Sequence, residues 1–226
     1  MPRKNRIIVE GLPHHVIQRG NRGQQVFFND ADRRFYLNIL NDRCRKHRIK
    51  VWAYCLMSNH VHLIMLPETA DGLSPAIGEA HQLYSCRINE RNAWRGGLWQ
   101  GRFLSFVMHD SYLFAAVRYV ERNPVRGGLA QRAEDYPWSS APSHVKGSRD
   151  PVLSPCPLLD EIEDWTAYLR SERKSHLEVL RKHSRSCLPL GRGDFLNALS
   201  FKLSVPLESL LPATIGRPTR PTRPNK

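Results

Sequence analysis

Apolar residues along the first two thirds of the chain recur in short runs that are typical of β-strands. Ser58 and Asn59 stand between two of these runs and supply a tight connection, which predicts an antiparallel hairpin. Gly101 lies inside the last run, where it weakens a strand or marks a bulge. The predicted strands are residues 12–19, 49–57, 60–66 and 98–108.

Between these strands the apolar positions follow the helical period. Asn29 or Asp30 can cap the first helix, and Ser74, followed by proline, can cap the second. Asp110 or Ser111 can cap the third, which the Asn-Pro step at 123–124 should stop. The predicted helices are residues 30–48, 74–92 and 111–123.

The order of these elements is β-α-β-β-α-β-α. A ferredoxin-like α+β domain, an antiparallel sheet with helices packed on it, accommodates this order with short connections. Near residue 150 the composition changes to prolines, an acidic cluster and a basic helical stretch. We therefore expect a first domain over residues 1–150, a helical extension over 151–212 and a disordered basic tail over 213–226.

The chain carries a strong excess of positive charge. Its 226 residues include 34 Lys and Arg against 21 Asp and Glu, a formal net charge of +13. This balance favours a polyanionic partner, with nucleic acid as the leading candidate and a solvated basic surface as the alternative. Without a signal-peptide pattern or a long apolar run, we expect a cytoplasmic protein with no membrane partner.

The cysteines do not predict a metal site, whereas two of the histidines could form one. Five cysteines are scattered without a C-x-x-C pair, which predicts reduced thiols and no zinc knuckle. His60 and His62 are two residues apart in a predicted strand, so both side chains project from the same face and could coordinate one metal ion. Ten histidines in 226 residues give about 0.4 such pairs by chance, so two histidines satisfied by backbone or water remain the alternative.

The third helix presents two stripes. One is its core face, and the other is a stripe of small residues bracketed by phenols and an amide. Tyr119 and Asn123 lie one turn apart on this second stripe, where a phenol beside an oxygen ligand could form a site. Tyr112 shares the stripe and is the competing tyrosine. A half-buried aromatic residue and an ordinary helix end would also explain the pattern.

Four separated stretches resemble the REP-associated tyrosine transposases, a branch of the HUH single-strand DNA endonucleases, and the resemblance spans roughly residues 8–140. It implies that His60 and His62 are the metal-binding histidines, Tyr119 the nucleophile and Asn123 the third ligand. It also implies Mg²⁺ or Mn²⁺ as the cofactor. The four stretches are HHVIQRGNR, YCLMSNHVHLIM, LWQGRFLSF and RYVERNPVRGGLA.

The resemblance implies a metal-dependent single-strand DNA endonuclease and strand transferase that works in DNA transposition through a 5′-phosphotyrosine intermediate. Its expected partner is single-stranded or hairpin DNA of repetitive extragenic palindromes. The alternatives are a domesticated DNA-binding protein of the same fold with little or no cleavage, and a zinc hydrolase, which would need a further His, Cys or carboxylate ligand. Monomer and homodimer both remain open.

Residues in predicted loops, interleaved with glycines and aromatic residues, are candidates for DNA contacts. Taken singly, an arginine in such a loop is more often a solvated surface residue than a DNA contact. In the tail, residues 216–218 (Gly-Arg-Pro) resemble the core of a minor-groove binder, with a plain basic tail as the alternative. The candidate DNA-binding residues are Arg19, Asn21, Arg22, Arg102 and Arg126.

Overall fold

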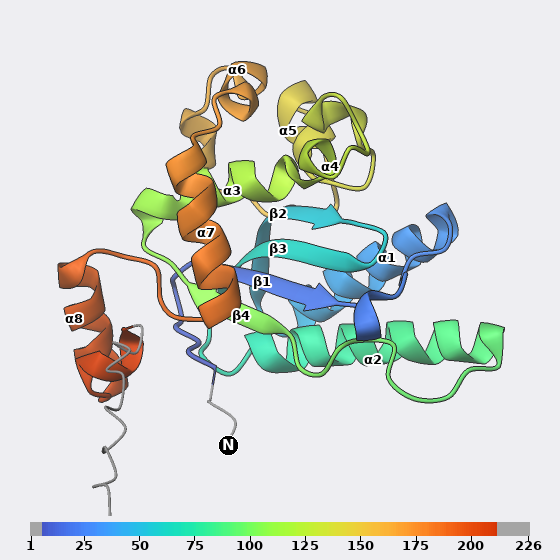
Figure 1. Cartoon of the computed structure of the whole chain (residues 1–226), viewed down its shortest axis with the longest axis horizontal. Helices are drawn as coiled ribbons and strands as arrows, with labels where there is room; N and C mark the ends of the chain where they lie inside the picture. Colours follow the sequence, from blue (N-terminus) through green and yellow to red (C-terminus); the bar gives the residue numbers. More distant parts are fainter. Residues whose placement is uncertain (1–5, 212–226) are drawn as a thin grey trace, which may run out of the picture.

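A four-stranded antiparallel sheet forms the centre of the protein in a computed structural model that describes residues 6–211 (Figure 1). Its order is β2-β3-β1-β4, so β1 and β3 are central and β2 and β4 are edge strands. All three pairings are antiparallel. The strands are β1 His14–Arg19, β2 Ile49–Leu56, β3 His60–Pro67 and β4 Leu104–Val107.

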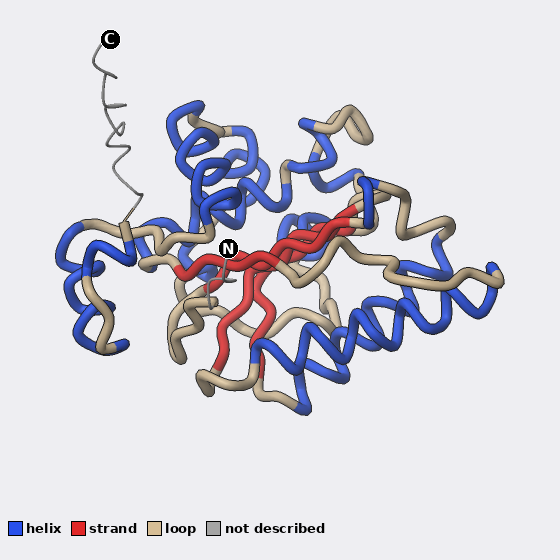
Figure 2. The backbone as a smooth tube through the Cα atoms, turned by 60° about the horizontal axis from the view of Figure 1, so that its bottom comes forward, coloured by secondary structure: helices blue, strands red, loops and turns tan. Residues whose placement is uncertain are grey.

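Two long helices cover one face of the sheet. They are α1, Asp30–Lys46, and α2, Leu73–Asn92, and they pack against each other as well as on the strands (Figures 1 and 2). Because side chains alternate along a strand, Val61, Leu63 and Met65 of β3 all enter this core, where they are fully buried.

The opposite face carries α3, Leu113–Glu121, and α7, Lys174–Ser186. Its core includes Ile64 from β3, Phe106 from β4 and Leu180 from α7, all buried. His60 and His62 belong to the same set of alternating positions as Ile64, so they lie on the α3 side of the sheet.

Short helices complete the chain on the α3 side and beyond the β4 edge. The α-helices are α4 Asn123–Arg126, α5 Ala141–Lys146, α6 Trp165–Arg170 and α8 Gly193–Leu203. The 3-10 turns are η1 Asn21–Gly23, η2 Asp110–Tyr112, η3 Ala133–Asp135, η4 Leu159–Glu161 and η5 Leu207–Leu210.

The predicted elements are all present, with differences at their ends. The fourth strand begins only at Leu104, because Gly101 adopts a left-handed φ of 61° that interrupts the extended chain. The second helix begins one residue early, at Leu73, and Ser74 makes no capping bond. The third helix stops at Glu121, and α4 starts at once with Asn123.

Residues of the C-terminal extension make backbone hydrogen bonds with the sheet strands. Ser154 N donates to Val51 O on β2 at 2.8 Å, and Leu190 N donates to Val107 O on β4 at 2.9 Å. The predicted tail over 213–226 and its Gly-Arg-Pro sequence lie outside the described residues. Within residues 6–211, none of the helices combines the length and apolar character needed to cross a membrane.

The N-cap of α1 gives a first testable prediction. The Asn29 side chain accepts a hydrogen bond from Asp32 N at 2.9 Å, as the sequence predicted. We expect Asn29→Ala to lower the free energy of unfolding by about 1 kcal/mol, measured by urea denaturation. Ser74→Ala is the matched control and is expected to change it by less than about 0.5 kcal/mol. Equal losses in the two variants would contradict this assignment of the caps.

Candidate active site

The two histidines of β3 lie side by side on the α3 face of the sheet. The ring centroids of His60 and His62 are 5.0 Å apart. His62 is buried and His60 is partly exposed at the end of the strand. Their alternation along β3 therefore brings both imidazoles to one place, as the sequence predicted.

Asn59 orients His60. Its Oδ1 lies 2.6 Å from His60 Nδ1, and its Nδ2 donates to Gly23 O at 3.0 Å in the turn that follows β1. Since the amide nitrogen is committed to that carbonyl, Oδ1 must accept, and His60 must carry its proton on Nδ1. His60 Nε2 is thus the nitrogen with a lone pair for a metal.

His15 on β1 is a neighbour of this pair that the sequence analysis missed. Its Nε2 lies 2.8 Å from His62 Nδ1, and its side chain is fully buried. This contact occupies Nδ1 of His62 and leaves Nε2 as its other ring nitrogen. The signal was present in the sequence, because His15 alternates with Ile17 and Arg19 on the same face of β1.

Burial keeps these imidazoles neutral. It lowers the pKa of His15 to about 3, with the nearby Arg126 charge contributing, and the pKa of His60 to about 4, with Arg19 contributing. The pKa of His62 is lowered well below its usual value, first by burial and then by His15, His60 and Arg126. Neutral imidazole is the form that binds a metal ion.

Tyr119 on α3 faces the histidines across the sheet surface. Its ring centroid lies 5.8 Å from those of both His15 and His62, and its side chain is 8% exposed. Tyr112 lies in the turn before α3 and packs partly buried at the border of the same core. Of these two tyrosines, Tyr119 is the one in ring contact with the histidines among the described residues.

Asn123 stands one turn beyond Tyr119. Its Nδ2 donates to the carbonyls of Tyr119 and Val120, each at 3.2 Å, so the amide oxygen remains for a ligand role. Within residues 6–211, no three His, Cys, Asp or Glu side chains form a metal-binding cluster. Two imidazoles and one amide oxygen are nevertheless nitrogen and oxygen donors of the kinds that divalent metal ions accept, so the residue types present are compatible with such an ion.

Arg126 stacks on Tyr119. Its guanidinium lies 4.4 Å from the ring centroid and also donates to the Tyr119 carbonyl oxygen. Glu172, just before α7, pairs with Arg126 at 2.6 Å and with Arg122 at 3.5 Å. Burial lowers the pKa of Arg126, and the charge of Glu172 counteracts this. Through Glu172, the C-terminal extension therefore holds Arg126 against the ring of Tyr119.

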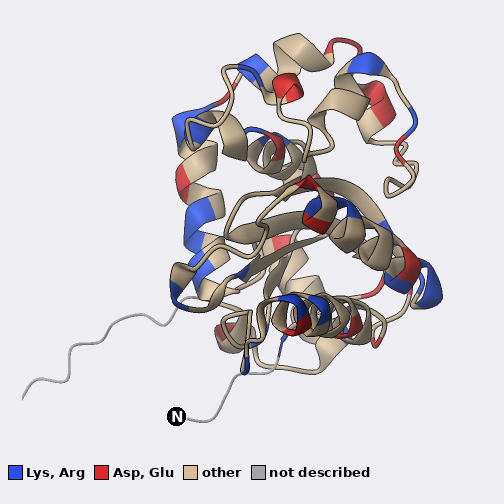
Figure 3. Ribbon diagram, turned by 90° about the vertical axis from the view of Figure 1, so that its right-hand side faces the viewer, with Lys and Arg blue, Asp and Glu red and all other residues tan. Residues whose placement is uncertain are grey.

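The remaining candidates for DNA contacts lie at the end of the sheet where His60 sits. Arg19 pairs with His60 in the β1–β3 register and is exposed, as are Asn21 and Arg22 in the following turn. Arg102 is exposed just before β4. Lys and Arg also occur on several helices around the molecule (Figure 3). Arg126, by contrast, contacts the ring of Tyr119.

Comparison with known proteins places this fold and site in a family. The sequence model of the family described as "Transposase IS200 like" matches residues 8–123, just over half of the 226 residues. The chain belongs to the IS200-like transposase family. The matched segment runs from Ile8, six residues before β1, to Asn123 and thus contains His15, the β3 histidines and Tyr119.

Two further similarities bear on the branch of the IS200-like transposases. A Haemophilus influenzae protein, described as a candidate REP-associated tyrosine transposase, is 29% identical over 133 residues, which cover 54% of this chain and 69% of that protein. The solved structure of a REP-associated tyrosine transposase bound to a REP hairpin has a TM-score of 0.56 and 20% identity, and the match covers 69% of this chain and 93% of that one. The predicted α+β fold is confirmed, and the chain is similar to proteins of the REP-associated branch, as the sequence resemblance predicted.

Proposed function

We propose that this transposase is a metal-dependent single-strand DNA endonuclease and strand transferase that acts on hairpin DNA through a 5′-phosphotyrosine intermediate. The observation that carries the proposal is the position of Tyr119, whose ring centroid lies 5.8 Å from that of His62. A phenol beside a pair of neutral, oriented imidazoles combines a nucleophile with metal ligands in one site.

His60, His62 and Asn123 would hold the divalent cation, Mg²⁺ or Mn²⁺, through two ring nitrogens and an amide oxygen. When bound, the cation supplies Lewis acidity that polarises a phosphate oxygen. The chain prepares the ligands: Asn59 fixes the tautomer of His60, and His15 engages Nδ1 of His62. Such outer contacts orient ligating histidines and tune their affinity.

Tyr119 is the nucleophile in the proposed step. Its phenolic oxygen loses its proton and bonds to phosphorus, while the bond from phosphorus to the 3′ oxygen breaks and that oxygen takes up a proton. DNA is then joined to the tyrosine through a 5′ phosphate, and a second DNA end can later displace the tyrosine. Arg126, 4.4 Å from the ring centroid, places positive charge near the atoms where negative charge develops.

Hairpin DNA with an unpaired flank is the proposed partner. The net charge of +13 favours a polyanion, and the exposed Arg19, Asn21 and Arg22 lie at the end of the sheet next to His60. A protein of similar fold is known bound to a REP hairpin, which supports the same class of DNA here.

The test is an adduct assay. The full chain is incubated with labelled hairpin DNA carrying unpaired flanks, in Mg²⁺ or Mn²⁺, and separated under denaturing conditions. We expect a protein–DNA adduct that forms with either metal and disappears with a chelator. Binding of many hairpins without any adduct would instead support a domesticated DNA-binding protein.

The contact between Glu172 and Arg126 gives a prediction for catalysis. We expect Glu172→Gln to slow adduct formation about tenfold, because Arg126 and Arg122 lose the carboxylate that holds them, and networked residues couple by roughly 0.5–3 kcal/mol. The loss should lie in the rate at saturating DNA rather than in DNA affinity, measured by single-turnover kinetics.

Two variants control this experiment. Glu178→Gln removes an exposed carboxylate from α7 and should leave the rate unchanged. Glu172→Asp keeps the charge and should restore most of the rate. A loss of affinity equal to the loss of rate would show that Glu172 supports DNA binding rather than the position of Arg126.

A further inference from the structure

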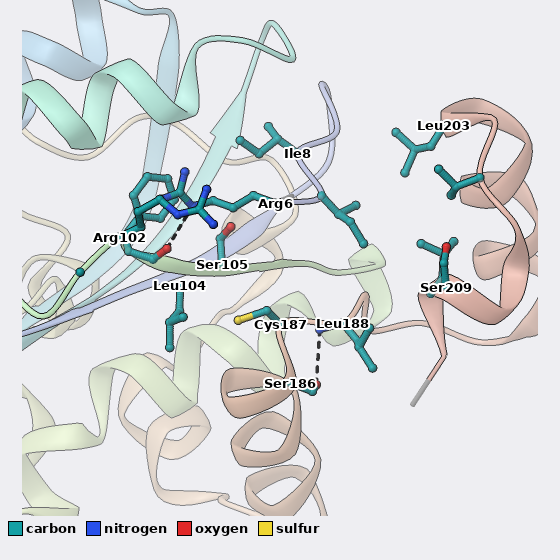
Figure 4. Close-up of a pocket in the computed structure, with 15 residues that line it drawn as sticks. Arg6, Ile8, Arg102, Leu104, Ser105, Ser186, Cys187, Leu188, Leu203 and Ser209 are labelled. Carbon is teal, nitrogen blue, oxygen red and sulfur yellow. Dashed lines mark hydrogen bonds between the residues drawn. The ribbon is translucent and has the colours of Figure 1, made fainter. Parts of the chain in front are cut away.

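A cavity of about 800 Å³ lies beyond the edge of β4, outside the histidine and tyrosine site. Figure 4 shows its walls: β4 and the N-terminal segment with Arg6 and Ile8 on one side, and α8 with Leu203 and the turn with Ser209 on the other. The end of α7 and the turn after it close it below, at Ser186–Leu188 (Figure 4). Its volume is that of a small-molecule site.

The lining of this edge cavity is apolar with positive charge at one end. Arg6 stacks on Phe103 at 3.8 Å and donates to the Phe103 carbonyl oxygen at 3.0 Å, and Arg102 lies close by. Burial, and then the charge of Arg102, lower the pKa of Arg6. Among residues 6–211, no acidic side chain lines the cavity, so this end of it suits an anion.

Ser105 is a buried polar residue in the wall of the edge cavity. Its side chain is 2% exposed, it lines the cavity, and its hydroxyl has no hydrogen-bond partner among the described residues. The hydroxyl oxygen itself has almost no accessible surface, so it does not reach a ligand in the cavity. A ligand with apolar faces and an attached anion fits the apolar lining and the two arginines.

The register of the sheet connects the edge cavity to the active site. Ile17 on β1 pairs with His62 on one side and with Leu104 on the other, so these three side chains form a row on the α3 face. Neighbouring strands lie about 4.8 Å apart, which puts Leu104 roughly 10 Å from the β3 histidines. Leu104 is 46% exposed and lines the edge cavity, so the row leads from the site to the cavity.

We propose that the edge cavity binds one unpaired nucleotide of the DNA close to the scissile phosphate. The base enters the apolar part, and the backbone phosphate lies at Arg6 and Arg102. Stacking and arginine contacts of this kind hold single strands. The inference rests on the proposed function, since it takes its ligand from the same DNA.

The experiment measures binding of hairpin DNA in which each position of the unpaired flanks is made abasic in turn. In the wild-type chain we expect one position at which base removal weakens binding about tenfold, because contacts to one base are worth roughly 1–3 kcal/mol. Arg6→Gln and Leu203→Trp, which remove the charge and fill the cavity, should each abolish the sensitivity at that position.

Matched controls separate this effect from general losses. Arg45→Gln removes an exposed charge from α1, and Phe201→Trp enlarges a side chain of α8 that is 90% exposed. Both should keep the wild-type abasic profile. If Leu203→Trp fails to fold, Arg6→Gln carries the test alone.

A flat abasic profile in the wild type, or an unchanged profile in Arg6→Gln, would overturn the inference. These outcomes are distinct from failure of the proposed function, which the adduct assay reports. If the chain forms the adduct but gives a flat abasic profile, only the proposed nucleotide site in the edge cavity is refuted. If the chain binds hairpins without forming any adduct, the proposed cleavage mechanism is refuted.

Discussion

Tyr119→Phe is expected to abolish formation of the covalent protein–DNA adduct, by at least about a thousandfold, while hairpin binding changes little. Phenylalanine lacks the hydroxyl that attacks phosphorus but keeps the ring that packs against His15, His62 and Arg126. The substitution therefore removes the attacking hydroxyl and keeps the packing contacts of the ring. Denaturing electrophoresis of labelled DNA measures the adduct, and filter binding measures affinity.

Tyr112→Phe is the matched control, because Tyr112 belongs to the same stripe of the sequence but lies in the turn before α3. We expect it to form the adduct at close to the wild-type rate. An adduct that survives Tyr119→Phe and disappears in Tyr112→Phe would show that the other tyrosine is the nucleophile.

His60→Ala is expected to reduce cleavage by at least about a hundredfold, because a bound metal supplies several kcal/mol of transition-state stabilisation. DNA affinity should fall far less. Single-turnover cleavage across a Mn²⁺ titration, alongside filter binding without metal, separates the two effects. Equal losses of cleavage and binding would mean that His60 supports the fold instead.

Two further variants make this test specific to the metal ligands. Asn59→Ala removes the acceptor for His60 Nδ1 and should raise the Mn²⁺ concentration for half-maximal cleavage about 10- to 100-fold. His47→Ala removes a histidine paired with Glu79 at the end of α1 and should leave the Mn²⁺ dependence unchanged. A shift common to both variants would contradict the proposed role of Asn59.

The C-terminal extension has a structural role at the proposed site. Arg118, Arg122 and Arg126 recur every four residues and reach the end of α6 and the segment that follows it, where Arg118 donates to Ser171 O at 2.8 Å and Arg122 to Leu169 O at 2.6 Å. Glu172 completes the contact. Because the extension anchors the helix that carries Tyr119, we propose that it sets the position of the nucleophile.

Much of this site follows from local sequence patterns. Alternation along β3 puts His60 and His62 on one face, and the helical period puts Tyr119 and Asn123 one turn apart. Both patterns depend only on backbone geometry over a few consecutive residues, so the sequence sufficed. Element ends were less predictable: the left-handed φ of Gly101 shortened the fourth strand, and Asn123 opened a new helix.

The sequence by itself thus determined the strands, the helices and the faces that carry the histidines and the tyrosine. Only the tertiary structure decided which faces meet. The contact of His15 with His62 depends on strand register, that of Arg126 with Glu172 joins residues 46 apart, and the edge cavity lies between β4 and α8. Such contacts arise from packing of distant segments, which no local period encodes.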